Sequence, residues 1–351
     1  MNEGITKTKL KEPFITESGH RIEQADAAYK TWGELNETRD NAILICHALT
    51  GHAAADEWFW GFFAPSGIFN PERNFVICIN VPGSCYGSVG PWSENPKSGK
   101  PYRNDFPELT IRDLVRFQQL LLDQLDIRGI EFVIGGSLGG MQALEFAIMD
   151  KRARAAVCIA MGKEHTPWAI GISHTQRRAS AADPKWNGGN YEYSSQPEKG
   201  LSAARMMAMI TYRSPADFER KFSRKLQGES DQFQIESYLD YQGKKLVNRF
   251  DAHSYINLTK AMDSHDVARG RGSDEYVLNR VKIPVLVVGV DSDLLYPVEE
   301  QKELAKLLPN GLYREISSYH GHDAFLIEFE QLNKIIRQFT KKTNSAIKQK
   351  I

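Results

Sequence analysis

One serine lies among four glycines in "EFVIGGSLGG", residues 131–140. Gly135, Ser137 and Gly139 have the spacing Gly-x-Ser-x-Gly, between an apolar run and a run with helical spacing. This pattern is typical of a nucleophilic serine on a tight strand-to-helix turn, because glycines leave room for a strained backbone and for a substrate. A helix that begins at Leu138 would also direct backbone N–H groups at the charge that develops during acyl transfer.

Two phosphate-binding motifs resemble this turn, and single residues exclude both. A dinucleotide-binding fingerprint needs a second glycine where Ser137 stands, and a Walker-type phosphate loop needs a lysine where Met141 stands. A nucleophile elbow and a plain glycine turn between two core elements remain. Because Gly-x-Ser-x-Gly often arises by chance, the rest of the chain decides between them.

A nucleophilic serine needs a histidine base and an acid that orients this base. On a strand–turn–helix of this type, the chain order is serine, acid, histidine. The apolar run "IPVLVVGV" is followed by Asp291 and Asp293, and "SSYHGHDAF" then supplies His320 and His322. The other seven of the nine histidines precede these acids. We therefore expect Ser137 to act with one late aspartate and one late histidine.

An acyl-transfer site also needs donors for the oxyanion of the tetrahedral intermediate. The backbone N–H of the residue after the nucleophile, Leu138, is one expected donor. The other should come from the loop after an earlier strand. That loop reads "HALTGH" after the apolar run at 41–48, so we expect the second donor to be the N–H of Leu49.

The elements that must hold these residues alternate between strand-like and helical patterns. Five continuous apolar runs of strand length favour a parallel sheet that is buried on both faces. They occupy 41–48, 74–80, 131–136, 154–160 and 283–290. Helical spacing follows at 110–127, where Thr110 is the expected cap, and again after Ser137, at 297–308 and at 323–342. These patterns predict an α/β-hydrolase fold, a mostly parallel doubly wound sheet flanked by helices.

One long segment interrupts the alternation. Residues 163–275 are polar and helical in pattern, with no strongly buried strand. We expect them to form a helical cap that is inserted into a core made of 1–162 and 276–351.

The composition is that of an ordinary globular enzyme. The chain has 351 residues, with 44 basic side chains balancing 44 acidic ones. It therefore gives no indication of a nucleic-acid or membrane partner. The cysteines lack metal-ligand spacing and are expected to be reduced core residues: Cys46, Cys78, Cys85 and Cys158. We expect a cytoplasmic enzyme without a metal site.

Several long stretches resemble the homoserine O-acetyltransferases of methionine biosynthesis. Among them are "HALTGHA", "GSCYGSVGP", "GGSLGGMQALEFA", "GLSAARMMAMITYRS", "DSDLLYPVEEQ" and "GHDAFLIE". The resemblance implies Ser137 as nucleophile, His322 within Gly-His-Asp as base, and Asp293 as the orienting acid, with Asp291 as the fallback. It also implies that Arg205 binds the substrate carboxylate and Asp323 its ammonium group, a division that suits a free amino acid.

The resemblance implies acetyl-CoA as co-substrate without a permanently bound cofactor, L-homoserine as acceptor, and a homodimer. The same scaffold leaves three alternatives: a succinyl donor, serine as acceptor, or a carboxylic-ester hydrolase. Departures from the family pattern at Val89, Trp92 and Arg103 leave the triad unchanged. We expect them in loops near the acyl entrance, so the donor is the less constrained part of this expectation.

Overall fold

The computed structural model describes residues 4–348, in which eight strands form one sheet. In sheet order these are β1 (Thr6–Lys9), β4 (Asp26–Trp32), β6 (Phe75–Ile79), β5 (Ala42–Cys46), β9 (Ile130–Gly136), β10 (Ala156–Ile159), β11 (Val285–Val290) and β12 (Gly311–Ile316). The six strands from β6 to β12 are parallel, and β4 and β1 add antiparallel pairs at one edge. The predicted mostly parallel sheet is therefore confirmed.

All five apolar runs form strands, and the strands that the patterns missed lie toward the edges of the sheet. The edge strand β12 has mostly intermediate or exposed residues, so it lacks the continuous apolar run of a central parallel strand. Strand β4 is antiparallel and buries only part of its length. Two short hairpins lie outside the main sheet: β2 (Phe14–Ile15) with β3 (Arg21–Ile22), and β7 (Glu94–Asn95) with β8 (Lys100–Pro101).

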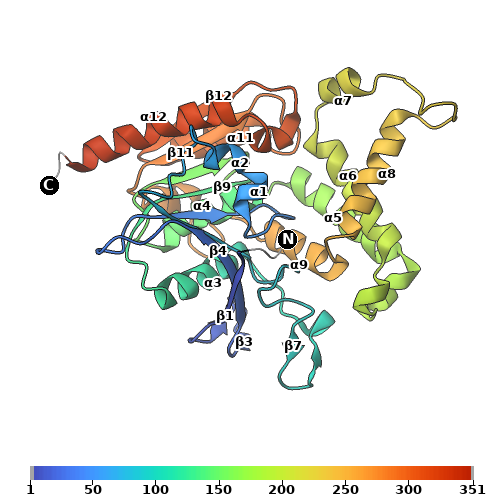
Figure 1. Ribbon diagram of the computed structural model, residues 1–351, viewed down its shortest axis with the longest axis horizontal. Coiled ribbons are helices and arrows are strands. Elements are labelled where there is room, and N and C mark those ends of the chain that lie inside the picture. Colours follow the sequence, from blue (N-terminus) through green and yellow to red (C-terminus); the bar gives the residue numbers. More distant parts are fainter. Residues whose placement is uncertain (1–3, 349–351) are drawn as a thin grey trace.

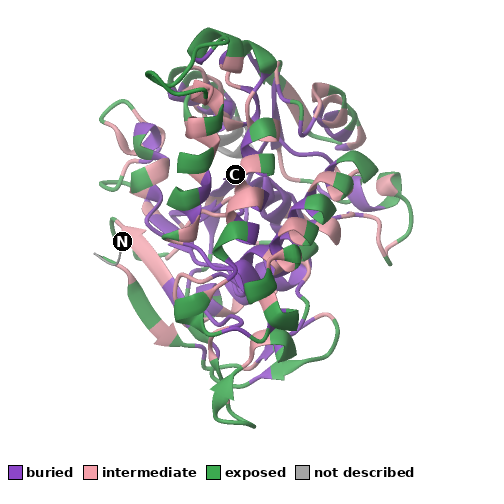
Figure 2. Ribbon diagram, turned by 90° about the vertical axis from the view of Figure 1, so that its right-hand side faces the viewer, coloured by how far each residue is buried: buried purple, intermediate pink, exposed green. Residues whose placement is uncertain are grey.

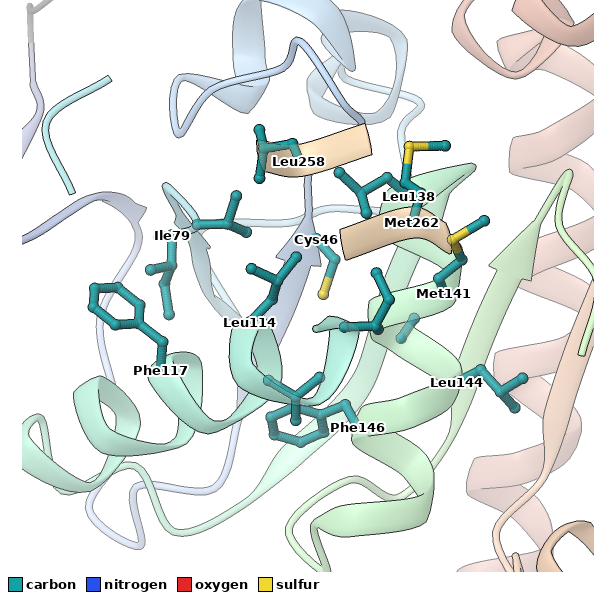
Figure 3. Packing of buried hydrophobic residues seen from close by; sticks show 14 of the residues in the cluster. Cys46, Ile79, Leu114, Phe117, Leu138, Met141, Leu144, Phe146, Leu258 and Met262 are labelled. Carbon is teal, nitrogen blue, oxygen red and sulfur yellow. The ribbon is translucent and has the colours of Figure 1, made fainter. Parts of the chain in front are cut away.

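Helices cover both faces of the sheet, so alternate strand residues enter two separate cores. One core lies under α3 (Ile111–Gln124), α4 (Leu138–Met149) and α11 (Val298–Leu307), and Figure 3 shows part of its packing. The other lies under α1 (Ala55–Trp58), α2 (Trp60–Phe63) and α12 (Phe329–Lys348). Figure 1 shows α12 and α3 on opposite sides of the sheet. The predicted cap of α3 is present, because Thr110 accepts from the Asp113 N–H and Asp113 accepts from the Thr110 N–H.

The segment between β10 and β11 forms a helical group beside the sheet (Figure 1). Its helices are α5 (Pro167–Ala182), η2 (Pro184–Gly189), η3 (Tyr193–Ser195), α6 (Glu198–Tyr212), α7 (Pro215–Lys221), α8 (Gln234–Val247) and α9 (Ala252–Asp263), and α10 (Asp274–Leu278) follows before β11. Residues 163–165 and 265–267, which we call the neck, pair as the chain leaves and returns. The His165 N–H donates to the His265 carbonyl at 2.7 Å, and the Val267 N–H donates to the Lys163 carbonyl at 3.2 Å.

Two further stretches position loops around the sheet. Residues 103–105 form the short helix η1 (Arg103–Asp105), and the predicted helix at 323–342 is divided into η4 (Gly321–Leu326) and α12. The division arises where Phe325 packs against the sheet, since a Cβ added to Gly136 would lie 2.5 Å from its Cδ2. Buried residues gather around the sheet, while exposed residues face outward on the helices (Figure 2). Between residues 4 and 348, no helix is long and apolar enough to cross a membrane.

Candidate active site

Ser137 occupies a strained turn between β9 and α4. Its backbone has φ 55° and ψ −125°, a conformation that a residue with a side chain rarely adopts. The Ser137 N–H donates to the Ile159 carbonyl of β10 at 2.9 Å, which fixes the turn to the neighbouring strand. A Cβ on Gly139 would lie 2.1 Å from the Cys46 carbonyl oxygen, so α4 approaches β5 closely only because this residue is glycine.

Gly139→Ala is therefore expected to displace the start of α4 from β5. We expect a loss of about 3 kcal/mol of stability, because the clash is with rigid backbone, together with a fall in turnover. Thermal unfolding and steady-state kinetics measure both effects. Gly171→Ala is the matched control, since nothing lies within 4 Å of its added Cβ on helix α5. There we expect a gain of up to about 1 kcal/mol from helix propensity; equal stability of the two variants would contradict the argument.

Asp293 and His322 form a buried pair at the same edge of the sheet. Asp293 follows β11, and His322 lies in η4 after β12, so both stand beyond the carboxyl ends of strands parallel to β9. The Nδ1 atom of His322 lies 2.7 Å from Oδ2 of Asp293. The other oxygen, Oδ1, accepts from the N–H groups of Leu295 (2.8 Å) and Tyr296 (3.0 Å). The two N–H groups thus fix the orientation of the Asp293 carboxylate, and this carboxylate fixes the orientation of the His322 imidazole.

The surroundings of His322 make it a base of defined tautomer. Because a carboxylate only accepts, Nδ1 carries the proton and Nε2 is left as the basic nitrogen. Rings of Tyr212, Tyr296 and Phe325 lie 5.4–5.5 Å from the imidazole and restrict its rotation. Burial lowers the pKa of His322, but the charge and hydrogen bond of Asp293, aided by Asp323, outweigh burial and raise this pKa above its ordinary value.

The other late aspartate and histidine have different partners. Asp291 is exposed and accepts from the Ser317 hydroxyl at 2.7 Å and the Ser318 N–H at 2.9 Å, so it fastens the loop after β12. The Nδ1 atom of His320 lies 3.1 Å from Oδ1 of Asp217, which belongs to α7. The structure therefore brings Asp293 together with His322 and leaves Asp291 and His320 outside this pair.

The two expected oxyanion donors come from adjacent segments. Leu138 is the first residue of α4, where an N–H has no partner within the helix. Leu49 lies in the loop after β5. The side chain of Gln142 joins the two segments, because its Nε2 donates to the carbonyls of His47 (3.1 Å) and Leu138 (3.0 Å). Sequence reasoning missed Gln142, since nothing in a helical pattern marks which polar residue is buried.

Arg205 and Asp323 both act on one aromatic residue, Tyr212, that the sequence argument did not single out. The guanidinium carbon of Arg205 lies 5.4 Å from the ring centre of Tyr212, whose ring packs against His322. Burial raises the pKa of Tyr212; Arg205 opposes this and Asp323 adds to it, so both charges act at the same ring. Asp323 also forms an ion pair, with Arg213 Nε 3.1 Å from its Oδ2. Tyr212 and Arg213 lie in the quoted stretch ending "TYRS", which was the available signal.

Comparison with known proteins places this arrangement in a family. A model of the α/β hydrolase fold matches residues 41–329. A homoserine O-acetyltransferase of Chloroherpeton thalassium is 50% identical over 333 residues, which cover 95% of this chain and 88% of the relative. The chain belongs to the homoserine O-acetyltransferase family. The crystal structure of homoserine O-acetyltransferase from Bacillus anthracis has a TM-score of 0.88 at 28% identity, covering 96% of this chain and 97% of that one.

The family's fold also occurs with a different chemistry. An acetylester hydrolase from Corynebacterium glutamicum has a TM-score of 0.85 at 27% identity, covering 97% of this chain and 98% of that one. A likeness of fold therefore does not by itself separate transfer to an alcohol from transfer to water.

Trp92 and Arg103, which we expected to depart from the family pattern, contact each other in the structure. The Trp92 Nε1 donates to Asp251 Oδ1 at 2.7 Å, and the guanidinium carbon of Arg103 lies 5.5 Å from the Trp92 ring. Arg103 also pairs with Glu192 at 2.6 Å. These residues fasten the loop that carries Trp92 to the segment between η2 and α6 and to the start of α9. Their contacts are thus between the sheet domain and the helical group.

Proposed function

We propose that the protein transfers an acetyl group from acetyl-CoA to the hydroxyl of L-homoserine, as a step of methionine biosynthesis. Family membership supports the activity. The observation that carries the chemistry is the 2.7 Å contact between His322 Nδ1 and Asp293 Oδ2, at the sheet edge where Ser137 stands on its strained turn. This arrangement suits covalent catalysis by an activated serine.

In the first half-reaction, the Ser137 hydroxyl oxygen attacks the thioester carbonyl of acetyl-CoA. His322 Nε2 takes the hydroxyl proton, and Asp293 stabilises the resulting imidazolium. The N–H groups of Leu49 and Leu138 donate to the oxyanion of the tetrahedral intermediate. The carbon–sulfur bond then breaks, the proton passes from His322 to the sulfur, and CoA leaves as a thiol. Ser137 keeps the acetyl group as an ester.

In the second half-reaction, homoserine takes the place of the thiol. His322 removes the proton of the homoserine side-chain hydroxyl, whose oxygen attacks the acetyl carbon of the ester. The same N–H groups stabilise the second oxyanion, and the bond to the Ser137 oxygen breaks. His322 returns the proton to Ser137, and O-acetylhomoserine leaves. The two substrates thus react one after the other, in a ping-pong mechanism.

The acceptor must be held by groups that match a free amino acid. Arg205 offers a planar guanidinium for the carboxylate, and Asp323 offers a carboxylate for the ammonium group. Asp323 is already paired with Arg213 at 3.1 Å, so the ammonium group shares this carboxylate with a fixed arginine. Such a pair keeps Asp323 oriented before the substrate arrives.

Arg205→Ala is expected to impair the use of homoserine far more than the use of acetyl-CoA. Loss of a charge-assisted contact to the carboxylate should lower kcat/KM for homoserine by about 10- to 100-fold. The rate at which acetyl-CoA acetylates Ser137 in the absence of homoserine, measured by mass spectrometry, should stay unchanged. Arg224→Ala, a cap arginine that stacks on Phe233, is the control. An unchanged dependence on homoserine concentration would remove Arg205 from the acceptor site.

The proposed activity is tested by an assay that varies both partners. Acetyl-CoA or succinyl-CoA is supplied with homoserine, serine or no acceptor, and both free thiol and acylated product are measured. The proposal expects O-acetylhomoserine from acetyl-CoA and homoserine at the highest kcat/KM. Faster turnover with succinyl-CoA or serine, or thiol release that does not depend on an acceptor, would replace it by one of the other acyl-transfer reactions.

We also propose that the enzyme is a cytoplasmic homodimer that needs no bound cofactor or metal. Exposed apolar side chains on α6, Met207 and Ile210, support the helical group as the contact surface. Light scattering of the purified protein tests the dimer: a monomer mass at micromolar concentration would contradict it.

A further inference from the structure

The guanidinium of Arg249 joins the helical group to the loop that carries Leu49. Arg249 follows α8, and its Nη1 donates to the Thr50 carbonyl and to the Tyr86 hydroxyl, each at 2.7 Å. Its Nη2 donates to the Thr50 hydroxyl at 3.2 Å. Thr50 and Arg249 are 199 residues apart in the chain, so these contacts depend on the tertiary fold.

Thr50 and Leu49 are the central residues of one tight turn. The Gly51 N–H donates to the Ala48 carbonyl at 2.8 Å, which closes a turn over residues 48–51. The direction of the Leu49 N–H depends on how the peptide units of this turn are rotated. The Thr50 carbonyl shares a peptide unit with the Gly51 N–H, and the Ala48 carbonyl that this N–H binds shares one with the Leu49 N–H. A contact that fixes the Thr50 carbonyl therefore restricts the orientation of the Leu49 N–H through the hydrogen bond that closes the turn.

The loop is anchored on the other side of Leu49 by the core. His47 Nε2 accepts from the Val81 N–H at 3.1 Å, and its Nδ1 lies 2.9 Å from the Ala48 carbonyl. Gln142 binds the His47 carbonyl. Leu49 thus lies between an anchor in the sheet domain at His47 and an anchor from the helical group at Thr50. Only the second anchor changes if the helical group moves.

Arg249 is half-buried, yet its guanidinium has only neutral partners among the residues that the structure describes. Within residues 4–348, no carboxylate lies within ion-pair distance of its guanidinium, so its direct partners are the neutral oxygens of Thr50 and Tyr86. Tyr86 is itself fixed, because Asn80 Nδ2 donates to its carbonyl at 2.6 Å and its ring packs against Phe250. Removing an unpaired charge from water is costly, which argues for a role at the turn rather than general stabilisation.

We infer that Arg249 is a positioning residue that holds the Leu49 N–H in the oxyanion hole from the helical group. The inference rests on the proposed function for the role of Leu49. It makes the geometry of the oxyanion hole dependent on the seating of the helical group. The arginine acts through the turn and needs no contact with substrate.

The test compares Arg249→Met, Arg249→Lys and Tyr86→Phe with the control Arg224→Met, using p-nitrophenyl acetate to acetylate Ser137. We expect Arg249→Met to slow acetylation by about 100-fold, the effect of losing one oxyanion donor. The lysine variant should fall between it and the wild type, because one ammonium can reach the Thr50 carbonyl. Tyr86→Phe should show a smaller loss, since both Thr50 contacts remain. The KM for homoserine should stay unchanged throughout.

A second measurement separates positioning from folding. A boronic acid that adds to Ser137 places an oxygen in the oxyanion hole, so its affinity should fall in parallel with the acetylation rate. Acetylation at the wild-type rate in Arg249→Met would overturn the inference. A rise in the KM for homoserine as large as the fall in the acetylation rate would also overturn it. If Arg249→Met does not fold, Arg249→Lys decides by the same criteria. Because p-nitrophenyl acetate needs neither CoA nor homoserine, a failure of the proposed function shows separately, as absent O-acetylhomoserine in the wild type.

Discussion

Ser137→Ala is expected to lower turnover by about 10⁴-fold or more while the protein stays folded. The hydroxyl is the only group lost, and alanine meets the same steric conflict as serine at φ 55°, so the strain of the turn is unchanged. Steady-state transfer and thermal unfolding measure the two quantities. Trapping of an acetylated enzyme by mass spectrometry should succeed with the wild type and fail with this variant.

The chain contains a matched control for this experiment. Ser223 also has a positive φ, 48°, but it is exposed at the end of α7 and far along the chain from the triad. Ser223→Ala should therefore keep full activity at nearly unchanged stability. Retention of activity by Ser137→Ala itself would remove the covalent mechanism, whatever the control shows.

Asp293→Asn is expected to cost about 10⁴-fold in kcat. The reason lies in how the carboxylate is shared. Its Oδ1 accepts two backbone N–H groups, from Leu295 and Tyr296, and only Oδ2 faces His322. In asparagine the oxygen keeps the two N–H donors, so the amide nitrogen faces Nδ1 and donates to it. The proton of His322 then moves to Nε2, which can no longer accept from Ser137.

The same variant should also change the pH dependence in a defined direction. His322 acts as a base only when neutral, so kcat/KM rises as the pH passes the pKa of His322. Asp293 holds this pKa above its ordinary value against the opposing effect of burial. Removing the carboxylate lowers the pKa, and the residual activity should therefore rise at lower pH than in the wild type. Asp291→Asn, whose partners are Ser317 and Ser318, should keep the wild-type profile. A shift toward higher pH in Asp293→Asn would contradict the assignment.

Asp293 could be predicted because it follows the buried strand β11, and a late histidine because the expected chain order places the base after the acid. Continuous apolar runs identify central parallel strands, and the carboxyl ends of such strands meet at one edge. The choice between His320 and His322 needed the family resemblance, because the two stand two residues apart in one loop. In the structure Gly321 turns the chain with φ 68°, so that His320 pairs with Asp217 and His322 with Asp293. A local pattern does not contain this information.

The groups that hold the site were not predictable in the same way. Each of these groups has a partner that is distant in the chain. Gln142 contacts His47, Arg213 contacts Asp323, and Arg249 contacts Thr50. Helical periodicity says which face of a helix is buried, but it does not say which polar side chain finds a partner there. The sequence patterns did not predict the edge strand β12, because its mostly intermediate or exposed residues lack a continuous apolar run.

The neck has a consequence for how such a protein can change over evolutionary time. The chain leaves the sheet and returns to it at one spot, where the His165 N–H meets the His265 carbonyl. The helices between these two residues therefore form an insertion whose ends are held together by the sheet domain. Lengthening or exchanging this insertion adds little to the entropic cost of closing the loop. The proposed nucleophile, acid and base, Ser137, Asp293 and His322, all lie outside these helices. Exchange of this one contiguous stretch would therefore replace the side chains that the helical group contributes, such as Arg205, and leave the register of every strand as it is.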